Sequence, residues 1–420
     1  MTIDGYSELP NLGSPSFTPL LLRYVSSHLG SRGWSINPSL FSILLLALIV
    51  RRGGIVIDVT KMDIVNVERM ITAMVKSIFG LHVHYLSIHE DLEPEELVDM
   101  LMHPPITHLS SLPDTPGDTP PPPNAYKWRE EQIERPEVLI ITGLEKASSP
   151  VRVKLGDIMV KKKIDIPSDS QKDVSLAEVD HVNMTKSEKK FDPLVIWIRE
   201  EGEEIPSFLI DQFMLGITLE PENNGLPPSD IDGSGIIPFD YINTLTSLLP
   251  YVHIHPPLQV HISNLLSAIS SHPSLKSVIT GKATRSFPEY IKAHRLLSGS
   301  FEIPSSFQVV SSISDEDRLK DTKGLGGGVG GVDTWASLAG EQPSLSTLSS
   351  DHDIEDPFAT PNNVEGIWRV FMKHRCRKRH ETEEVMWLIK GSATENKMPK
   401  RKNGKGRGVD KILDEIIRTV

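Results

Sequence analysis

The sequence predicts an α/β fold in which a parallel sheet is covered by helices on both faces and is followed by a small all-helical domain. Short runs rich in β-branched residues, such as residues 54–59 (GIVIDV) and 194–198 (LVIWI), alternate with helical patterns, as buried parallel strands do. After residue 238 the strand signals stop, and helical patterns continue around residues 241–249, 257–271 and 286–297. The 420 residues are enough for two or three domains with separate cores.

The elements of the expected α/β core, residues 16–225, follow from changes in apolar period along the chain. Further strands are expected at residues 81–88, 137–142 and 215–219, and helices at residues 17–29, 39–50, 63–79, 94–102, 148–159 and 206–212. Residues 1–15 are expected to be a flexible N-terminus, and residues 103–126 a proline-rich insertion loop. The charged segment 161–190 fits no single element.

The most apolar segment is residues 40–50 (LFSILLLALIV). At about 11 residues it is short of the roughly 20 needed to cross a bilayer. A buried helix is therefore expected rather than a membrane anchor, and no membrane contact is predicted.

Three further units are expected after the core. Residues 238–312 form a helical lid domain, residues 313–361 a disordered linker rich in Gly, Ser, Asp and Pro, and residues 362–420 a basic C-terminal module. In the C-terminal module, cations and apolar residues interleave. Three roles are open for residues 369–407: binding of nucleic acid, a nuclear-import signal, or docking on the acidic core of this chain or a neighbour.

Composition narrows the class of protein. The formal net charge of −12 argues against a protein that coats nucleic acid with its whole surface. The single cysteine, Cys376, excludes an intramolecular disulfide framework and fits the cytoplasm or nucleus. Neighbouring cations should lower the pKa of this thiol if it is exposed.

Three segments together resemble the ATPase subunit of magnesium chelatase and its AAA+ relatives. They are residues 204–215 (EIPSFLIDQFML), the paired helical segments between residues 255 and 299, and residues 138–159 (VLIITGLEKASSPVRVKLGDIM). The resemblance covers about residues 16–310. It implies an AAA+ P-loop NTPase-like core with a lid, and ATP and Mg²⁺ as cofactors.

The motifs that ATP chemistry needs are nevertheless missing. The first strand is followed by DVTKMDIVNVERMI, which lacks glycine and the G-K-[S/T] signature, and Lys61 is its only early cation. Thr142 and Gly143 occupy the places of the acidic pair after the third strand, and residues 198–200 (IRE) lack the polar γ-phosphate sensor. Gln212 stands where the family has an arginine finger.

The resemblance leaves three candidate nucleotide-binding residues and no catalytic one. Arg285 is placed where the family has a phosphate-sensing arginine, although an ion pair with a core carboxylate is the alternative. Lys61 is either a phosphate ligand or a solvated loop lysine. In the context of the resemblance, Asp211 is expected to fix the turn before the last strand.

Two other patterns are expected to carry no chemistry. Residues 326–331 (GGGVGG) satisfy a dinucleotide-binding pattern without the required strand before them. His253, His255 and His261 lack a carboxylate or thiolate partner in sequence, so packing histidines are favoured over a metal site.

Three functions remain open from the sequence. The first is a magnesium-chelatase-like AAA+ protein with eroded motifs, acting as a non-hydrolysing or weakly nucleotide-binding interaction module with protein partners or as a homo-oligomer. The second is an active ATP-dependent chelatase or remodelling ATPase with unrecognised substitutes. The third is a nucleic-acid-associated protein acting through its basic C-terminus.

Overall fold

The computed structural model describes residues 9–30, 34–59, 64–102, 136–166, 187–202, 205–219, 235–303, 357–379 and 408–420. Several predictions concern residues outside these ranges: Lys61, the insertion loop 103–126, the glycine run 326–331, nearly all of the linker, and the whole stretch 380–407 of the basic module.

Five parallel strands form the central sheet, in the order β2-β3-β6-β1-β7. They are β1 (Gly54–Val59), β2 (Val83–Ser87), β3 (Val138–Thr142), β6 (Leu194–Glu200) and β7 (Phe213–Leu219). The non-consecutive neighbours require crossover connections, which the intervening helices supply. The predicted parallel α/β core is confirmed.

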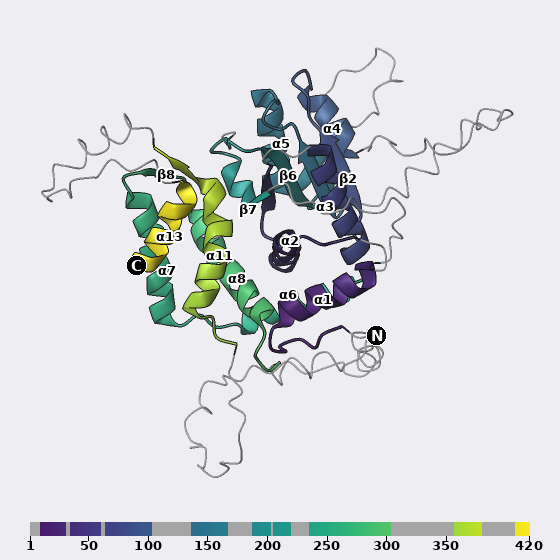
Figure 1. Ribbon diagram of the computed structural model, residues 1–420. Coiled ribbons are helices and arrows are strands. Elements are labelled where there is room, and N and C mark those ends of the chain that lie inside the picture. Colours follow the sequence, from purple (N-terminus) through teal and green to yellow (C-terminus); the bar gives the residue numbers. More distant parts are fainter. Residues whose placement is uncertain are drawn as a thin grey trace, which may run out of the picture.

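Helices cover both faces of this sheet (Figure 1). They are α1 (Phe17–Gly30), α2 (Pro38–Val50), α3 (Ile64–Phe79), α4 (Pro94–Met102) and α5 (Ser149–Lys161). Because side chains alternate along a strand, Ile55 and Ile57 face a core shared with α1, α2 and α3, whereas Val56 and Trp197 face one shared with α4 and α5.

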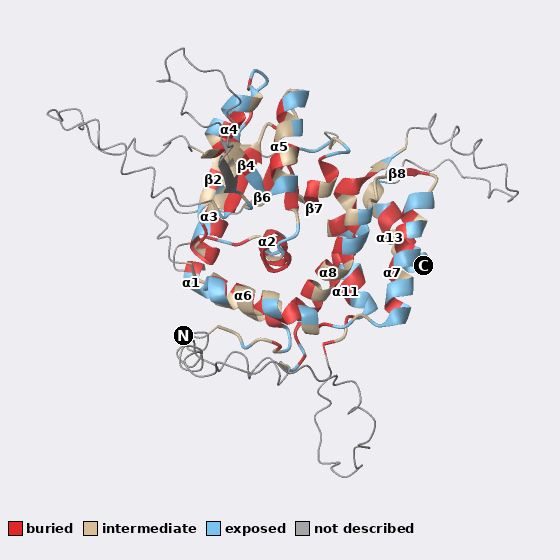
Figure 2. Ribbon diagram, turned by 180° about the vertical axis from the view of Figure 1, so that it is seen from behind, coloured by how far each residue is buried: buried red, intermediate tan, exposed pale blue. Residues whose placement is uncertain are grey.

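Helix α2 is the buried helix predicted from residues 40–50. It lies between the sheet and the helices α1, α6 and α8, and it is buried along almost its whole length (Figure 2). Asn37 caps its first turn by accepting from the backbone N–H of Leu40 at 3.0 Å. None of the helices that the structure describes is long and apolar enough to cross a membrane.

The predicted lid and the C-terminal module pack together into one helical domain beside β7 (Figure 1). Its elements are α6 (Phe239–Leu248), η4 (Leu249–Tyr251), α7 (Pro256–Ser271), β8 (Leu275–Ser277), α8 (Gly281–Ser298), α11 (Pro361–Met372), η6 (Lys373–Arg375), β9 (Cys376–Lys378) and α13 (Val409–Thr419). Helix α11 packs on α8 and β7, α13 packs on α7 and α11, and β8 pairs with β9. Docking of the basic module on its own chain therefore occurs in the described part.

Several boundaries differ from the sequence prediction. Helix α8 begins at Gly281 rather than near residue 286, because the hydroxyl of Thr280 accepts from the N–H of Ala283 at 3.2 Å and caps it there. The expected helix 206–212 is a turn that ends in the 3₁₀ segment η3 (Ile210–Gln212). The ambiguous segment 161–190 contains the antiparallel pair β4 (Lys163–Ile166) and β5 (Ser187–Lys190).

Two segments expected to be flexible are tied to the helical domain where they are described. Near the N-terminus, the hydroxyl of Tyr241 donates to the carbonyl of Pro10, and the N–H of Phe301 donates to the carbonyl of Gly13 at 3.1 Å. At the end of the predicted linker, Phe358 forms a bridge with His253. These contacts hold residues 9–15 and 357–361 in place.

Candidate functional site

Two of the three predicted site residues, Asp211 and Arg285, lie near one end of the sheet, and the third is adjacent in sequence to the other end. Asp211 directly precedes β7 at the amino ends of the parallel strands, and Arg285 lies in the first turns of α8, near that end. Lys61 lies outside the described residues, two positions after Val59 at the carboxyl end of β1. A strand of six residues separates its two ends by roughly 16–20 Å. The structure thus brings Asp211 and the start of α8 together, at the end away from Val59.

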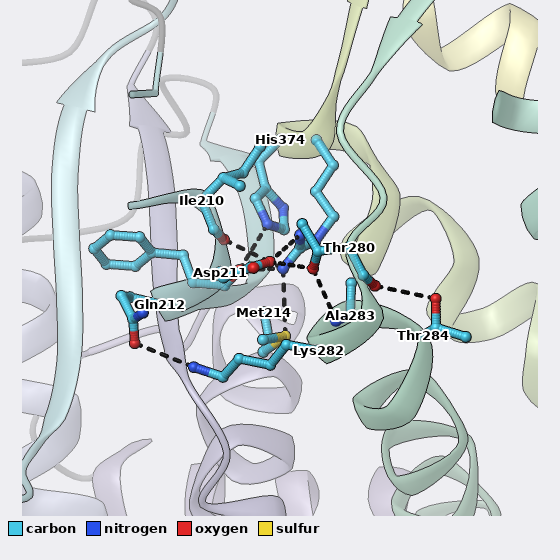
Figure 3. Close-up of polar contacts among 11 residues, drawn as sticks. Ile210, Asp211, Gln212, Met214, Thr280, Lys282, Ala283, Thr284 and His374 are labelled. Atoms are coloured by element: carbon cyan, nitrogen blue, oxygen red, sulfur yellow. Dashed lines mark hydrogen bonds and ion pairs between the residues drawn. The ribbon is translucent and has the colours of Figure 1, made fainter. Parts of the chain in front are cut away.

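Asp211 joins the core to the helical domain (Figure 3). Its Oδ1 accepts from the hydroxyl of Thr280, at the start of α8, and from Nη1 of Arg375 at 3.2 Å. The side chain of Arg375 is fully buried, and its Nη2 donates to the carbonyls of Ile210 at 3.2 Å and Phe213 at 2.9 Å. Asp211 therefore holds the turn before β7 and connects it to two helical segments.

Arg375 was not singled out by sequence reasoning, which treated it as one cation of a basic run. The available signal was its position after the apolar stretch 370–372 (VFM), which α11 buries in part against α8 and β7. The neighbouring His374 is also buried, and its Nε2 lies 3.0 Å from the carbonyl of Phe213. Burial, followed by the charge of Arg375, lowers the pKa of His374 well below its usual value.

Lys282 lies on the same end of the sheet, one position after the start of α8. Its Nζ donates to the amide oxygen of Gln212 at 3.1 Å (Figure 3). Burial lowers the pKa of Lys282; the carboxylate of Asp211 opposes this shift, whereas Lys162 and Arg375 add to it. The residue that replaces the expected arginine finger thus binds a lysine of the helical domain.

Arg285 is exposed, and among the described residues no hydrogen bond or ion pair engages its guanidinium. The alternative of an ion pair with a core carboxylate is not seen there. Its Nη1 lies 3.7 Å from the position that a Cβ of Gly281 would occupy, so the side chain folds back along the first turn of α8.

A cleft of about 410 Å³ opens at the amino ends of the strands, between the core and the helical domain. Its walls come from α2, α5, α6 and α8 and from the segments before β1, β3, β6 and β7. Four cations line it: Arg51, Lys162, Lys190 and Lys282. Sequence reasoning missed this cleft because its cations come from four distant segments.

The carboxyl end of the sheet, where the resemblance would place phosphates, has a different character. Asp58 in β1 and Arg199 in β6 form a buried ion pair, with Nε of Arg199 at 2.6 Å from Oδ1 of Asp58. The guanidinium also lies 5.3 Å from the ring of Trp197. Acidic side chains predominate among the described charged residues just after β2, β3 and β6. These residues are Glu90, Asp91, Glu145, Lys146, Glu200 and Glu201.

Gly143, at the place of the second acid of the expected pair, has no room for a side chain. Its φ is +74°, and a Cβ there would lie 2.2 Å from the carbonyl oxygen of Ile88. Glu145, the nearest substitute along the chain, lies with its Oε2 3.4 Å from Nε1 of Trp197. A carboxylate at position 143 would require the backbone to move.

Other predictions for the helical domain concern its histidines and its cysteine. His255 stacks on Phe358 with ring centroids 4.3 Å apart, which matches the packing interpretation. Within the described ranges no group of His, Cys, Asp and Glu is arranged to hold a metal ion. Cys376 is buried, so the condition for a lowered pKa is not met, and burial instead raises its pKa to about 12.

Several described cations of the C-terminal module form ion pairs within the chain. Arg369 pairs with Asp414 at 2.6 Å and Lys373 with Asp410 at 3.2 Å, both on α13, whereas Arg375 is buried at β7. Nucleic-acid phosphates would have to compete with these contacts.

Comparison with known proteins supports the fold and nothing finer. No protein-family model matches the chain, and no curated protein matches its sequence. A solved structure described as a putative ATPase from Cytophaga hutchinsonii is similar to it, with a TM-score of 0.53 and 11% sequence identity over 96% of each chain. At this identity the similarity concerns the fold alone. Together with the five-stranded parallel sheet, it shows that the chain has an α/β, P-loop NTPase-like fold.

Proposed function

We propose that this chain is a magnesium-chelatase-like AAA+ protein that acts as a non-hydrolysing or weakly nucleotide-binding interaction module. The observation that carries the proposal is the carboxyl end of the sheet. There Gly143 leaves no space for an acidic side chain, and the charge of Asp58 is neutralised by Arg199. Hydrolysis of ATP needs a carboxylate to position water or Mg²⁺ and cations to stabilise the phosphates.

Exposed apolar side chains on α5 and the turn before β7 support an interaction role. Val153 and Val160 are 52% and 62% exposed and share a helix face because they are seven residues apart. Phe208, 47% exposed, lies beside Gly156 on the same helix. Such a patch is the kind of surface that a partner protein or a second copy covers. A cytoplasmic or nuclear location, expected from the single cysteine, completes the proposal.

Calorimetric titration of the full chain with Mg-ATP tests the nucleotide part. We expect no heat, or weak binding that is unchanged in Lys61→Ala. Affinity that falls by tenfold or more in Lys61→Ala would instead support the active ATPase, because a lysine after the first strand is the phosphate ligand of such enzymes.

The interaction part has its own test. Light scattering after gel filtration should show self-association that is reduced in Val160→Lys, since a charge at the centre of an apolar contact is costly. Lys154→Met, at a half-buried position on the same helix, is the matched control. A monomer at all concentrations would exclude the homo-oligomer and leave a different partner protein as the occupant of this surface.

A further inference from the structure

The cleft at the amino ends of the strands has the size of a small-molecule site. Its volume of about 410 Å³ falls within the roughly 300–1,000 Å³ of typical ligand pockets. It lies where the core meets the helical domain, and such boundaries are common places for binding sites. It is at the opposite end of the sheet from the place where the resemblance would put ATP.

The charged groups that line the cleft leave an excess of positive charge. Four cations, Arg51, Lys162, Lys190 and Lys282, face two carboxylates, Glu137 and Asp192. Asp192 is paired with Lys162 at 2.9 Å, and Glu137 accepts from the backbone N–H of His82 at 3.1 Å. Among the described residues that line the cleft, four positive charges against two negative ones leave two, which favours a dianion.

Lys282 is the cation whose surroundings most need an anion. It is half-buried, and the hydrogen bond seen for its ammonium group is to the neutral amide of Gln212. The nearby carboxylate of Asp211 is already engaged by Thr280 and Arg375. Burial and the proximity of Lys162 disfavour its charged form, and an anion in the cleft would reverse this effect.

The cleft also has an apolar wall. Leu48, Phe191 and Phe239 line it, and the guanidinium of Arg51 lies 4.9 Å from the centre of the Phe239 ring. Arg51 is held there by hydrogen bonds to the carbonyl of Leu48 and the side chain of Asn243. A ligand with an apolar or aromatic body could pack here while its charged group meets the lysines.

We propose that this cleft binds a small organic phosphomonoester, whose dianionic phosphate contacts Lys282 and Lys190 and whose apolar body packs between Leu48, Phe191 and Phe239. A phosphate carries close to two negative charges and several acceptor oxygens at neutral pH, which matches the excess charge and the lysine donors. The proposal is independent of the proposed function, because it concerns the other end of the sheet and requires no nucleotide hydrolysis.

Isothermal calorimetry of the full chain tests it with phenyl phosphate, inorganic phosphate and the neutral analogue benzyl alcohol as probes. We expect phenyl phosphate to bind with a Kd below about 1 mM, inorganic phosphate to bind more weakly, and benzyl alcohol not to bind. Raising the salt concentration should weaken the binding of phenyl phosphate. Absence of phenyl phosphate binding up to several times that concentration would overturn the proposal.

Matched lysine variants place the site. Lys282→Met keeps the length of the side chain and removes its charge, and it should raise the Kd for phenyl phosphate by about tenfold or more. Lys276→Met, an exposed lysine on β8 outside the cleft, should leave the Kd unchanged. If Lys282→Met does not fold, Lys190→Met at the exposed rim should still raise the Kd severalfold. Binding that is unaffected by both cleft variants would place the ligand elsewhere and contradict the proposal.

Discussion

The two ends of the central sheet have opposite chemistry. At the carboxyl end, acidic side chains predominate among the described residues, and the buried cation Arg199 is paired with Asp58. At the amino end, cations from four segments line a cleft, and Arg375 binds the turn that leads into β7. The resemblance to AAA+ proteins implies that phosphates bind at the carboxyl end. Among the described residues, positive charge instead gathers at the amino end of the sheet and at the junction with the helical domain.

The largest effect should come from removing the buried cation at the amino end. Arg375→Met leaves a carboxylate and two carbonyls without their shared donor, and we expect a loss of about 4 kcal/mol in the free energy of unfolding. Urea denaturation of the full chain measures it. Lys378→Met, an exposed cation on β9, is the control and should change stability little. Equal stability of the two variants would show that Arg375 does not hold the helical domain on β7.

The buried pair at the carboxyl end gives the matching test. Arg199→Met leaves the carboxylate of Asp58 buried without its ion-pair partner, and we expect a loss of about 3 kcal/mol. The double variant Asp58→Leu/Arg199→Met should recover much of this loss, because apolar residues can replace a buried pair. If the double variant is no more stable than Arg199→Met, the unpaired charge of Asp58 is not the cause of the loss, which contradicts this explanation.

A smaller effect should follow from adding a side chain at Gly216 of β7, where His374 of the helical domain packs against the strand. A Cβ at Gly216 would lie 2.8 Å from Nδ1 of His374 and 2.9 Å from its Cβ, so Gly216→Ala should cost about 2 kcal/mol. In a His374→Ala background the same substitution should cost much less. A similar cost in both backgrounds would mean that β7 itself, and not its contact with His374, is sensitive.

The smallest predicted effect is a pH dependence from the same contact. Nε2 of His374 donates to the carbonyl of Phe213, and its Nδ1 has no hydrogen-bond partner within the described structure. Its pKa is lowered in the folded state, so below about pH 6.5 the unfolded chain binds a proton that the folded chain does not. Stability should be complete above that pH and fall by up to about 1.4 kcal/mol per unit below it.

Denaturation curves at pH 7 and pH 5.5 measure this effect. His84 and His294 also have lowered pKa values because of burial, and they add to the slope. His374→Gln should therefore reduce the dependence without removing it. A dependence that is identical in wild type and His374→Gln would exclude this histidine as a contributor.

The sequence predicted most of the core because its signals are local. The run GIVIDV at residues 54–59 is apolar enough to predict a buried strand without knowledge of its neighbours. The apolar segment 40–50 predicts a buried helix in the same way. Predictions at helix ends were less accurate because one cap decides them, as Thr280 does for α8.

The site could not be predicted in the same way because it depends on distant contacts. Arg375 and Asp211 are 164 positions apart. The apolar stretch 370–372 before Arg375 indicates burial nearby, but it does not show which cation of the basic run is buried. Likewise, the excess positive charge of the cleft arises only when residues 51, 162, 190 and 282 meet. By contrast, the absence of the acid at Gly143 was visible in sequence, and the structure supplies the steric reason.

Steady-state hydrolysis of ATP by the purified full chain, in the presence of Mg²⁺, tests the account most directly. We predict phosphate release no faster than the buffer background. Thr142 and Gly143 stand where the acidic pair is expected, and the segment after the first strand lacks the G-K-[S/T] signature that the reaction needs. Turnover above background that is abolished in Arg285→Ala would contradict the account and identify an active ATPase.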